Sequence, residues 1–316
     1  MKDISCQTIS VVVPFLNEAD NLPLLYERVA GVMANRPEKL ELLLVDDGST
    51  DGSADWAREQ SHRDGRVRLL QLSRNYGHQI AIAAGLDHVA GDAVVIMDAD
   101  LQDPPEVIPV LLAKWREGFE VVSAVRRSRQ GETWHKKFLA AVFYRLFRAL
   151  VKVDVPLNAG DFRLLDRQVV LAIRQMRETH RFLRAMTSWT GYRHTTVEYD
   201  REPRHAGETK YPIWKSVRLA FDAITSFSGT PLRWVMGLGG AISLAGLLFL
   251  VWIVIGRIFH PESARGWASL MALVLFMGGI QLVCIGLIGQ YISSIYEEGK
   301  KRPLYFLRNA DSVVSE

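Results

Sequence analysis

The chain has 316 residues, of which 48% are hydrophobic and 23% are charged, and its formal net charge is only +3. This length allows one α/β domain of about 200 residues and a smaller second part. The small net charge argues against general nucleic-acid binding. Its two cysteines, Cys6 and Cys284, make a disulfide framework implausible and fit a reducing compartment. Residues 1–7 lead straight into an apolar run, so we expect no cleaved signal peptide.

Residues 9–124 alternate short β-branched runs with amphipathic segments of helical period, a pattern typical of a parallel sheet covered by helices. We expect strands at 9–14, 40–46, 67–72, 93–97 and 120–124. The segments 21–35, 53–64, 79–90 and 106–117 are predicted helices. The sequence therefore predicts a doubly wound α/β domain, which we place at residues 1–205.

Residues 134–152 have an apolar stripe that recurs about once per helical turn, and Lys, Arg and His occupy the positions between. Such a basic amphipathic helix suits an anionic membrane surface. The alternative is a helix that packs its stripe on the protein core and exposes its basic side. The apolar segments further along the chain favour the membrane surface.

Two uncharged apolar stretches near the C-terminus exceed the roughly 18 residues that a membrane-spanning helix needs. We expect transmembrane helices at about 234–256 and 268–292, within residues 231–296, after a juxtamembrane linker and helix at 206–230. Basic residues before the first span and after the second place both ends, including the tail 297–316, in the cytosol. The chain is therefore predicted to be a multi-pass membrane protein whose α/β domain lies in the cytosol.

A row of small residues, Gly237, Ala241 and Ala245, follows one face of the first predicted span at i, i+4 spacing. Small side chains let membrane helices approach closely, either within one chain or between copies. A homo-oligomer formed through these helices is therefore an expectation.

Acidic residues follow three of the predicted strands, at the edge where an open α/β sheet binds its ligands. Asp46 and Asp47 follow the second strand, and Asp98 and Asp100 follow the fourth, while Glu18 lies after the first. Carboxylates gathered in this way repel one another unless a cation or ligand donors are present. Asp98 and Asp100 alternate along the chain, so they converge only through a bend or a shared ligand. We expect the shared ligand to be a hard divalent ion such as Mg²⁺ or Mn²⁺, which prefers oxygen ligands.

These motifs carry a family resemblance. The strings Val-Val-Pro-Phe-Leu-Asn-Glu, Val-Asp-Asp-Gly-Ser-Thr-Asp and Asp-Ala-Asp-Leu-Gln-Asp-Pro-Pro resemble family 2 glycosyltransferases of the polyprenyl-phosphate type. Segments around Asp161, Lys210, Arg233 and Tyr305 resemble the bactoprenol glucosyltransferase branch of that family, which carries two C-terminal spans. Together the motifs cover nearly the whole chain.

The resemblance implies a Rossmann-like GT-A fold and assigns roles to residues at its loops. A nucleotide sugar is expected at Pro14, Phe15, Glu18, Asp46, Asp47 and Asp98, with Phe15 standing where relatives often have Tyr. The implied metal ligands are Asp98, Asp100 and Gln102. Catalytic roles fall to Asp100 and to Asp161, and the lipid phosphate is expected at Arg126, Lys137, Arg204 and Lys210.

The implied reaction is transfer of a hexose, expected to be glucose from UDP-glucose, to polyprenyl (undecaprenyl) phosphate with inversion at the anomeric carbon. A phosphomonoester has a second pKa of about 6, so the acceptor is largely anionic and needs no strong general base. Asp161 then orients the acceptor or takes its last proton, unless it is simply paired with Arg163. His78 and His205 are further candidates for phosphate contact.

Three alternatives remain open. The same chemistry with amino-arabinose or an N-acetylhexosamine as the sugar changes only the donor. A processive polysaccharide synthase is disfavoured, because the chain has no Gln-x-x-Arg-Trp motif. A catalytically silent membrane scaffold that binds nucleotide is disfavoured by the intact Asp98, Asp100 and Asp161.

Overall fold

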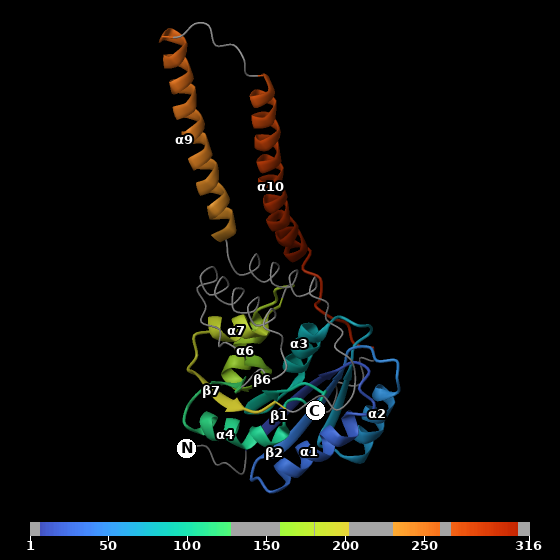
Figure 1. Ribbon diagram of the computed structural model, residues 1–316. Helices are drawn as coiled ribbons and strands as arrows, with labels where there is room; N and C mark the ends of the chain where they lie inside the picture. The colour runs from blue at the N-terminus through green and yellow to red at the C-terminus, as the bar shows by residue number, and fades with distance from the viewer. Residues whose placement is uncertain (1–6, 128–158, 180, 202–229, 260–266, 309–316) are drawn as a thin grey trace. The chain divides into compact units, whose positions relative to one another are not determined.

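A computed structural model describes residues 7–127, 159–179, 181–201, 230–259 and 267–308 (Figure 1). The chain forms two compact units. The first contains the α/β region together with the residues from Pro303 onward, and the second contains the two long helices near the C-terminus.

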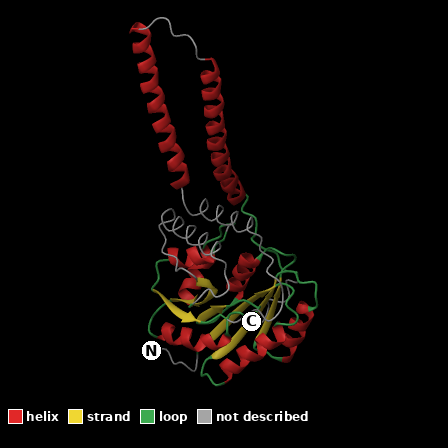
Figure 2. Ribbon diagram, viewed as in Figure 1, coloured by secondary structure: helices red, strands yellow, loops and turns green. Residues whose placement is uncertain are grey.

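The α/β unit is built on a seven-stranded sheet of order β3-β2-β1-β4-β6-β5-β7 (Figure 2). Its strands are β1 (Thr8–Phe15), β2 (Lys39–Asp46), β3 (Val67–Gln71), β4 (Ala93–Ile96), β5 (Val121–Arg126), β6 (Ala159–Asp166) and β7 (His194–Tyr199). The five predicted strands are all present with slightly shifted ends. β1 to β4 pair in parallel as predicted, whereas β6 runs antiparallel to both of its neighbours. The sheet is therefore mixed, which corrects the expectation of a parallel sheet.

Helices cover both faces of this sheet, with α1, α2 and α4 on one side and α3, α6 and α7 on the other (Figure 1). They are α1 (Leu22–Ala34), α2 (Ser53–Arg63), α3 (His78–His88), α4 (Ile108–Arg116), α6 (Arg167–Gln175) and α7 (Leu183–Trp189), and the 3-10 turn η2 (Pro105–Val107) precedes α4. The four predicted helices correspond to α1 to α4. The structure confirms the Rossmann-like α/β architecture.

The core sits between the central strands and the helices. Val11 and Val13 of β1 are fully buried in one apolar cluster with Leu25 of α1 and Leu111 of α4. On the opposite face, α3 comes so close to β1 that a Cβ at Gly85 would lie 2.3 Å from Cγ1 of Val12. This close packing holds α3, whose first residue is His78, against β1.

The described helices of the second unit are α9 (Thr230–Phe259) and α10 (Trp267–Gly299). Among the described residues, one helical segment, Phe276–Gly299, is long and apolar enough to cross a membrane, with a mean hydropathy of 1.5. The apolar segment Trp234–Phe249 of α9 is shorter. The structure thus supports a span in α10, while a second span in α9 remains a prediction.

Several predicted features lie outside the described residues. They are the basic helix 134–152 with Lys137, and the juxtamembrane residues 206–229 with Lys210. Arg204 and His205 also lie outside.

Candidate active site

Three acidic loops share the carboxyl edge of β2, β1 and β4, which are adjacent parallel strands. The loops after β1 and β2 are joined by hydrogen bonds. The Asn17 amide donates to Oγ of Ser49 at 3.0 Å, and Oδ1 of Asn17 accepts from the Thr50 amide at 2.8 Å. Asn17 has a φ of 57°, which asparagine tolerates better than most residues. The predicted gathering of these loops at one edge is confirmed.

The residues that directly end β1 are largely enclosed. Pro14 is buried, and Phe15 belongs to the apolar core and is 3% exposed. Glu18 lies at the start of α1, where its Oε2 accepts a hydrogen bond from Nδ2 of Asn21 at 2.6 Å. Their assignment to the nucleotide sugar remains a prediction.

The two carboxylates after β2 are buried and hold neighbouring loops. Asp46 accepts from the Ser49 amide at 2.8 Å and from Nε2 of Gln71 at 3.2 Å. Asp47 accepts from the amides of Tyr76 and Gly77 at 2.7 and 2.9 Å. Burial raises the pKa of Asp47, and these two backbone donors oppose the rise. Each carboxylate oxygen has a second lone pair, so a nucleotide contact is compatible with these bonds.

The segment Asp98-Ala99-Asp100 forms a turn after β4. Leu101 has a φ of 59°, an unfavourable conformation for a residue other than glycine that costs about 1–3 kcal/mol. Asp100 is buried, and its Oδ1 accepts from the Gln102 amide at 3.2 Å. The turn supplies the bend that convergence of Asp98 and Asp100 requires. Strain of this kind marks functional sites.

The surroundings of Asp98 fit a cation. Its Oδ1 is buried and accepts no hydrogen bond from the described residues, although Nε2 of His78 lies 3.3 Å away. Burial raises the pKa of Asp98; the charge of His78 opposes this, while the charges of Asp161 and Asp100 add to it. A divalent ion would relieve this repulsion with the oxygen ligands that Mg²⁺ and Mn²⁺ prefer. Within the described ranges, no group of three or more His, Cys, Asp or Glu side chains already surrounds a common metal position.

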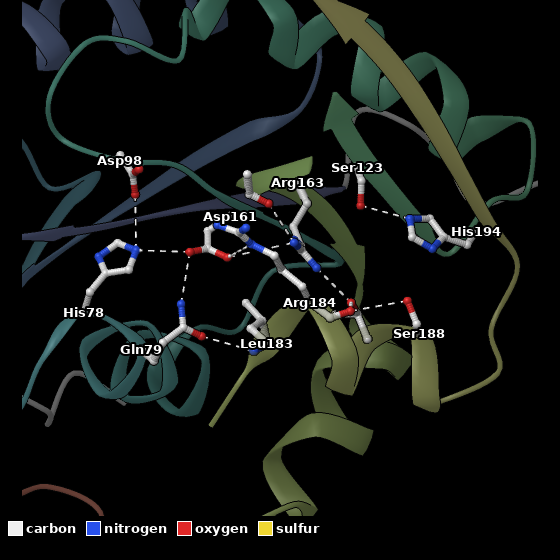
Figure 3. A network of polar contacts seen from close by, with 12 residues as sticks. His78, Gln79, Asp98, Ser123, Asp161, Arg163, Leu183, Arg184, Ser188 and His194 are labelled. Carbon is white, nitrogen blue, oxygen red and sulfur yellow. Dashed lines mark hydrogen bonds and ion pairs between the residues drawn. The ribbon is translucent and has the colours of Figure 1, made fainter. Parts of the chain in front are cut away.

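Asp161 stands beside this turn because β6 runs antiparallel to β4. Ile96 pairs with Arg163, so Asp98, two residues after Ile96, and Asp161, two residues before Arg163, lie at the same edge. Three side chains surround the Asp161 carboxylate (Figure 3). Nε of Arg184 donates to Oδ1 at 3.0 Å, Nε2 of Gln79 donates to Oδ2 at 3.0 Å, and Nε2 of His78 lies 3.4 Å from Oδ2.

These neighbours keep Asp161 ionised. Burial alone would raise its pKa, but the charge of Arg184, the hydrogen bond from His78 and the charge of Arg163 hold the pKa well below its usual range. Burial likewise opposes the charge on His78, yet the hydrogen bond to Asp161 and the charge of Asp98 raise its pKa to about 9. The site is therefore a compact set of opposite charges.

The alternative from the sequence paired Asp161 with Arg163, but Arg163 lies further from this carboxylate than Arg184 does. Its Nη2 lies 3.9 Å from Oδ1 of Asp161. The guanidinium instead donates to Oγ1 of Thr187 and to the carbonyl of Gly160, both at 2.8 Å. Burial lowers the pKa of Arg163 to about 10. Arg163 therefore ties β6 to α7, and Arg184 is the close partner of Asp161.

Arg184 and Gln79 were not identified from the sequence. Both are polar residues on helices, and no motif around them predicts a shared partner. Only the antiparallel placement of β6 brings Asp161 between α3 and α7.

Arg126, at the end of β5, belongs to a second polar group at the same edge. Its Nε donates to the Tyr199 hydroxyl at 3.4 Å, and that hydroxyl donates to Oδ1 of Asp103. Burial and the charge of Asp98 raise the pKa of Asp103 to about 6. A Cβ at Gly160 would lie 3.3 Å from Nη2 of Arg126, so this guanidinium lies beside the start of β6. Arg126 is the one predicted lipid-phosphate residue that the structure describes.

Comparison with known proteins agrees with this architecture. The profile of Glycosyl transferase family 2 matches residues 10–174, and that of the GtrB C-terminal hairpin matches residues 230–295. An uncharacterized glycosyltransferase of Bacillus subtilis is 46% identical over 304 residues, which cover 96% of this chain and 94% of the relative.

Two further relatives have more specific names. The bactoprenol glucosyl transferase of Shigella phage SfV is 39% identical over 301 residues, covering 95% of this chain and 98% of its own. A prophage bactoprenol glucosyl transferase homolog of Escherichia coli is 38% identical over 300 residues, with the same two coverages. With its family match, its near full-length relatives and the acidic edge of its mixed sheet, the chain belongs to glycosyltransferase family 2 and is a transferase enzyme.

Proposed function

We propose that this enzyme transfers glucose from UDP-glucose to undecaprenyl phosphate, with inversion, at the cytosolic face of the bacterial inner membrane. One observation carries the proposal: Asp98, Asp100 and Asp161 meet at one sheet edge in a chain that matches a bactoprenol glucosyl transferase along nearly its whole length. The sugar and the lipid follow from the names of the relatives, and the site chemistry is compatible with both.

The donor is assigned to the loops after β1, β2 and β4. Asp46 holds the loop after β2 and Asp47 holds the amides of Tyr76 and Gly77, and both carboxylates retain acceptor capacity for ribose or uracil donors. Glu18 adds a carboxylate at the start of α1. The UDP diphosphate is then placed beside Asp98 and Asp100.

A divalent ion, Mg²⁺ or Mn²⁺, is assigned to Asp98, Asp100 and Gln102. The buried Oδ1 of Asp98, which accepts no hydrogen bond from the described residues, is the observation that favours it. When bound there, the ion supplies charge stabilisation for the departing diphosphate.

In the proposed reaction an oxygen of the acceptor phosphate forms the bond to the anomeric carbon while the bond to UDP breaks. The acceptor is already largely anionic near neutral pH, because its second pKa is about 6. Asp161 is itself kept ionised and takes up hydrogen bonds from Arg184 and Gln79. We assign it to fixing the positions of Arg184 and His78, whose positive charges face the acceptor, with Arg126 as a third cation.

The membrane assignment rests on α9 and α10. Residues from Pro303 onward belong to the same unit as the catalytic sheet, so both ends of the α9–α10 segment are joined to that unit. A polypeptide that leaves and returns to one side of a bilayer crosses it an even number of times. This connectivity favours two spans, with α9 as the second, and a catalytic domain in the cytosol.

The proposal is tested with the purified full-length protein, undecaprenyl phosphate in detergent, Mn²⁺ or Mg²⁺, and radiolabelled UDP-glucose. Radioactivity in the organic phase is expected, with the anomeric configuration inverted by NMR. An Asp100→Ala variant should lose this transfer, whereas Asp55→Ala, on the exposed surface of α2, should keep it. UDP-linked amino-arabinose and N-acetylhexosamines in the same assay identify the sugar. Transfer from none of these donors would refute the proposed function.

A further inference from the structure

Residues 303–308, here called the C-terminal segment, pair with the edge strand β3. Leu307 forms an antiparallel bridge with Leu72, the residue directly after β3. The Ser73 amide donates to the Phe306 carbonyl at 2.8 Å, and the Arg308 amide donates to the Gln71 carbonyl at 2.9 Å. The C-terminal segment therefore lies antiparallel beside the carboxyl end of β3, joined to it by one bridge and two backbone hydrogen bonds.

A second contact fixes the same segment to α3. The Tyr305 hydroxyl donates to Oδ2 of Asp87 at 3.0 Å and lies 3.4 Å from Nδ1 of His88. The Tyr305 and His88 rings meet edge to face, with centroids 6.0 Å apart. Burial and the Asp87 carboxylate raise the pKa of Tyr305, so its hydroxyl remains a donor at neutral pH.

Gln71 and Ser73, the two residues on the β3 side that bond to the C-terminal segment, are each connected to a carboxylate of the acidic loop after β2. Gln71 accepts from Arg308 with its carbonyl and donates from Nε2 to Asp46. Ser73 begins the loop 73–77, in which the amides of Tyr76 and Gly77 hold Asp47. The Ser73 hydroxyl also lies 3.0 Å from the Tyr76 hydroxyl. Gln71 thus connects the C-terminal segment to Asp46, and loop 73–77 connects it to Asp47.

The loop 73–77 also packs tightly against the loop after β2. A Cβ at Gly48 would lie 2.8 Å from the Asn75 nitrogen and 2.9 Å from the Arg74 carbonyl carbon. A shift of loop 73–77 therefore moves the Asp47 and Gly48 backbone as well. Fixing this loop in advance removes an ordering cost from ligand binding.

We propose that the C-terminal segment is a positioning element of the nucleotide site, which fixes Gln71 and loop 73–77 and through them the carboxylates of Asp46 and Asp47. The inference rests on the proposed function in taking the ligand of this site to be a uridine diphosphate. Loss of the pairing lowers affinity for UDP and its sugar, and leaves affinity for the lipid acceptor unchanged.

Arg308 offers a matched pair of variants. Arg308→Pro removes the amide that bonds to Gln71 and keeps the preceding residue extended, whereas Arg308→Ala keeps the amide. In the full-length protein with Mn²⁺, Arg308→Pro is expected to weaken UDP binding by about two- to tenfold in calorimetry. Arg308→Ala is expected to stay within about twofold. Equal UDP affinity of the two variants would overturn the proposal.

Tyr305→Phe tests the second contact, because it keeps the ring against His88 and removes the hydrogen bond to Asp87. We expect about a two- to tenfold rise in KM for the UDP-sugar, with kcat and the KM for the lipid unchanged. Tyr26→Phe is the control, since it removes a similar bond to Asp64, on the loop after α2. A rise in both KM values, or in neither, contradicts a role at the nucleotide site.

Hydrogen exchange separates this inference from the proposed function. Amides of residues 73–77 should exchange faster in Arg308→Pro than in Arg308→Ala, whatever ligand the site takes. Unchanged exchange with normal transfer refutes the positioning role and leaves the transferase intact. Faster exchange in a protein that binds no UDP supports the coupling of segment and loop and refutes the uridine diphosphate assignment.

Discussion

Arg184 and Asp161 lie on different elements, α7 and β6, and Nε of Arg184 donates to Oδ1 of Asp161 at 3.0 Å. Against the effect of burial, the charge of Arg184 helps to hold the pKa of Asp161 well below its usual range, so the carboxylate stays ionised and is a weaker proton acceptor than an unpaired one. Gln79, which also donates to Asp161, comes from α3, 82 residues earlier in the sequence, so three separate elements meet at this carboxylate. The position of Asp161 therefore depends on the packing of α3 and α7.

Arg184→Gln should lower kcat by about ten- to hundredfold, because hydrogen bonds to charged groups contribute about 1.5–3 kcal/mol. Arg184→Lys keeps the charge and should recover part of the loss. The measurement is the initial rate of transfer with both substrates saturating. Arg63→Gln, which removes an exposed ion pair with Glu59, is the control. Wild-type kcat in Arg184→Gln would show that Asp161 needs no fixed partner.

Chelation of divalent ions should abolish transfer, because the UDP diphosphate then lies beside the carboxylates of Asp98 and Asp100 with no divalent ion between these like charges. We expect EDTA to stop the reaction and Mg²⁺ or Mn²⁺ to restore it. Direct binding of Mn²⁺, measured by electron paramagnetic resonance without substrate, should weaken in Asp100→Asn and remain in Asp55→Asn. Full transfer in EDTA would argue against the assignment of these ligands.

Tyr199→Phe should raise the KM for the lipid phosphate several-fold, because Arg126 loses the hydroxyl that receives its Nε hydrogen bond. The lost bonds are worth about 0.5–1.5 kcal/mol each. The edge-to-face contact between Tyr199 and Phe162 remains, so the fold should persist. Tyr26→Phe, which removes the tyrosine hydroxyl that donates a hydrogen bond to Asp64, should leave both KM values unchanged. A rise confined to the KM for the UDP-sugar would show that Arg126 contributes to the donor site and not to the acceptor site.

Gly48→Ala should both destabilise the protein and weaken UDP binding. Gly48 and Gly52 each have a positive φ, 84° and 92°, so alanine costs about 1–2 kcal/mol of backbone strain at either position. A Cβ at Gly48 also collides with the Arg74 and Asn75 backbone, whereas a Cβ at Gly52 meets nothing within 4 Å. Thermal unfolding should show the larger loss for Gly48→Ala, and UDP affinity should fall only there. Equal losses would show that the contact between the two loops adds nothing.

The first half of the catalytic unit was predictable because its strands are parallel, buried and rich in β-branched residues. Val94 and Val95, for example, precede Asp98 and Asp100 in a run that has no competing helical pattern. Once parallel strands are expected, the location of their acidic loops at one edge follows from geometry.

The second half was not predictable from the same rules. β6 carries Asp161 and Arg163 among buried apolar residues, so its sequence lacks the clean alternation of a strand. Its insertion between β4 and β5 in the opposite direction is a property of the whole sheet and has no local signal. Arg184 became a partner of Asp161 only through that insertion, and α7, which carries it, has only seven residues.

The pairing of the C-terminal segment also has a consequence for biosynthesis. Tyr305 and Asp87 are 218 residues apart in the sequence, and α9 and α10 are synthesised between them. Domains generally fold from the N-terminus during translation. Here the edge beyond β3 stays open until residues 303–308 leave the ribosome. Under the proposed function, the nucleotide-binding loops are therefore completed only after both long helices have been made, so the donor site is finished no earlier than the proposed membrane anchor.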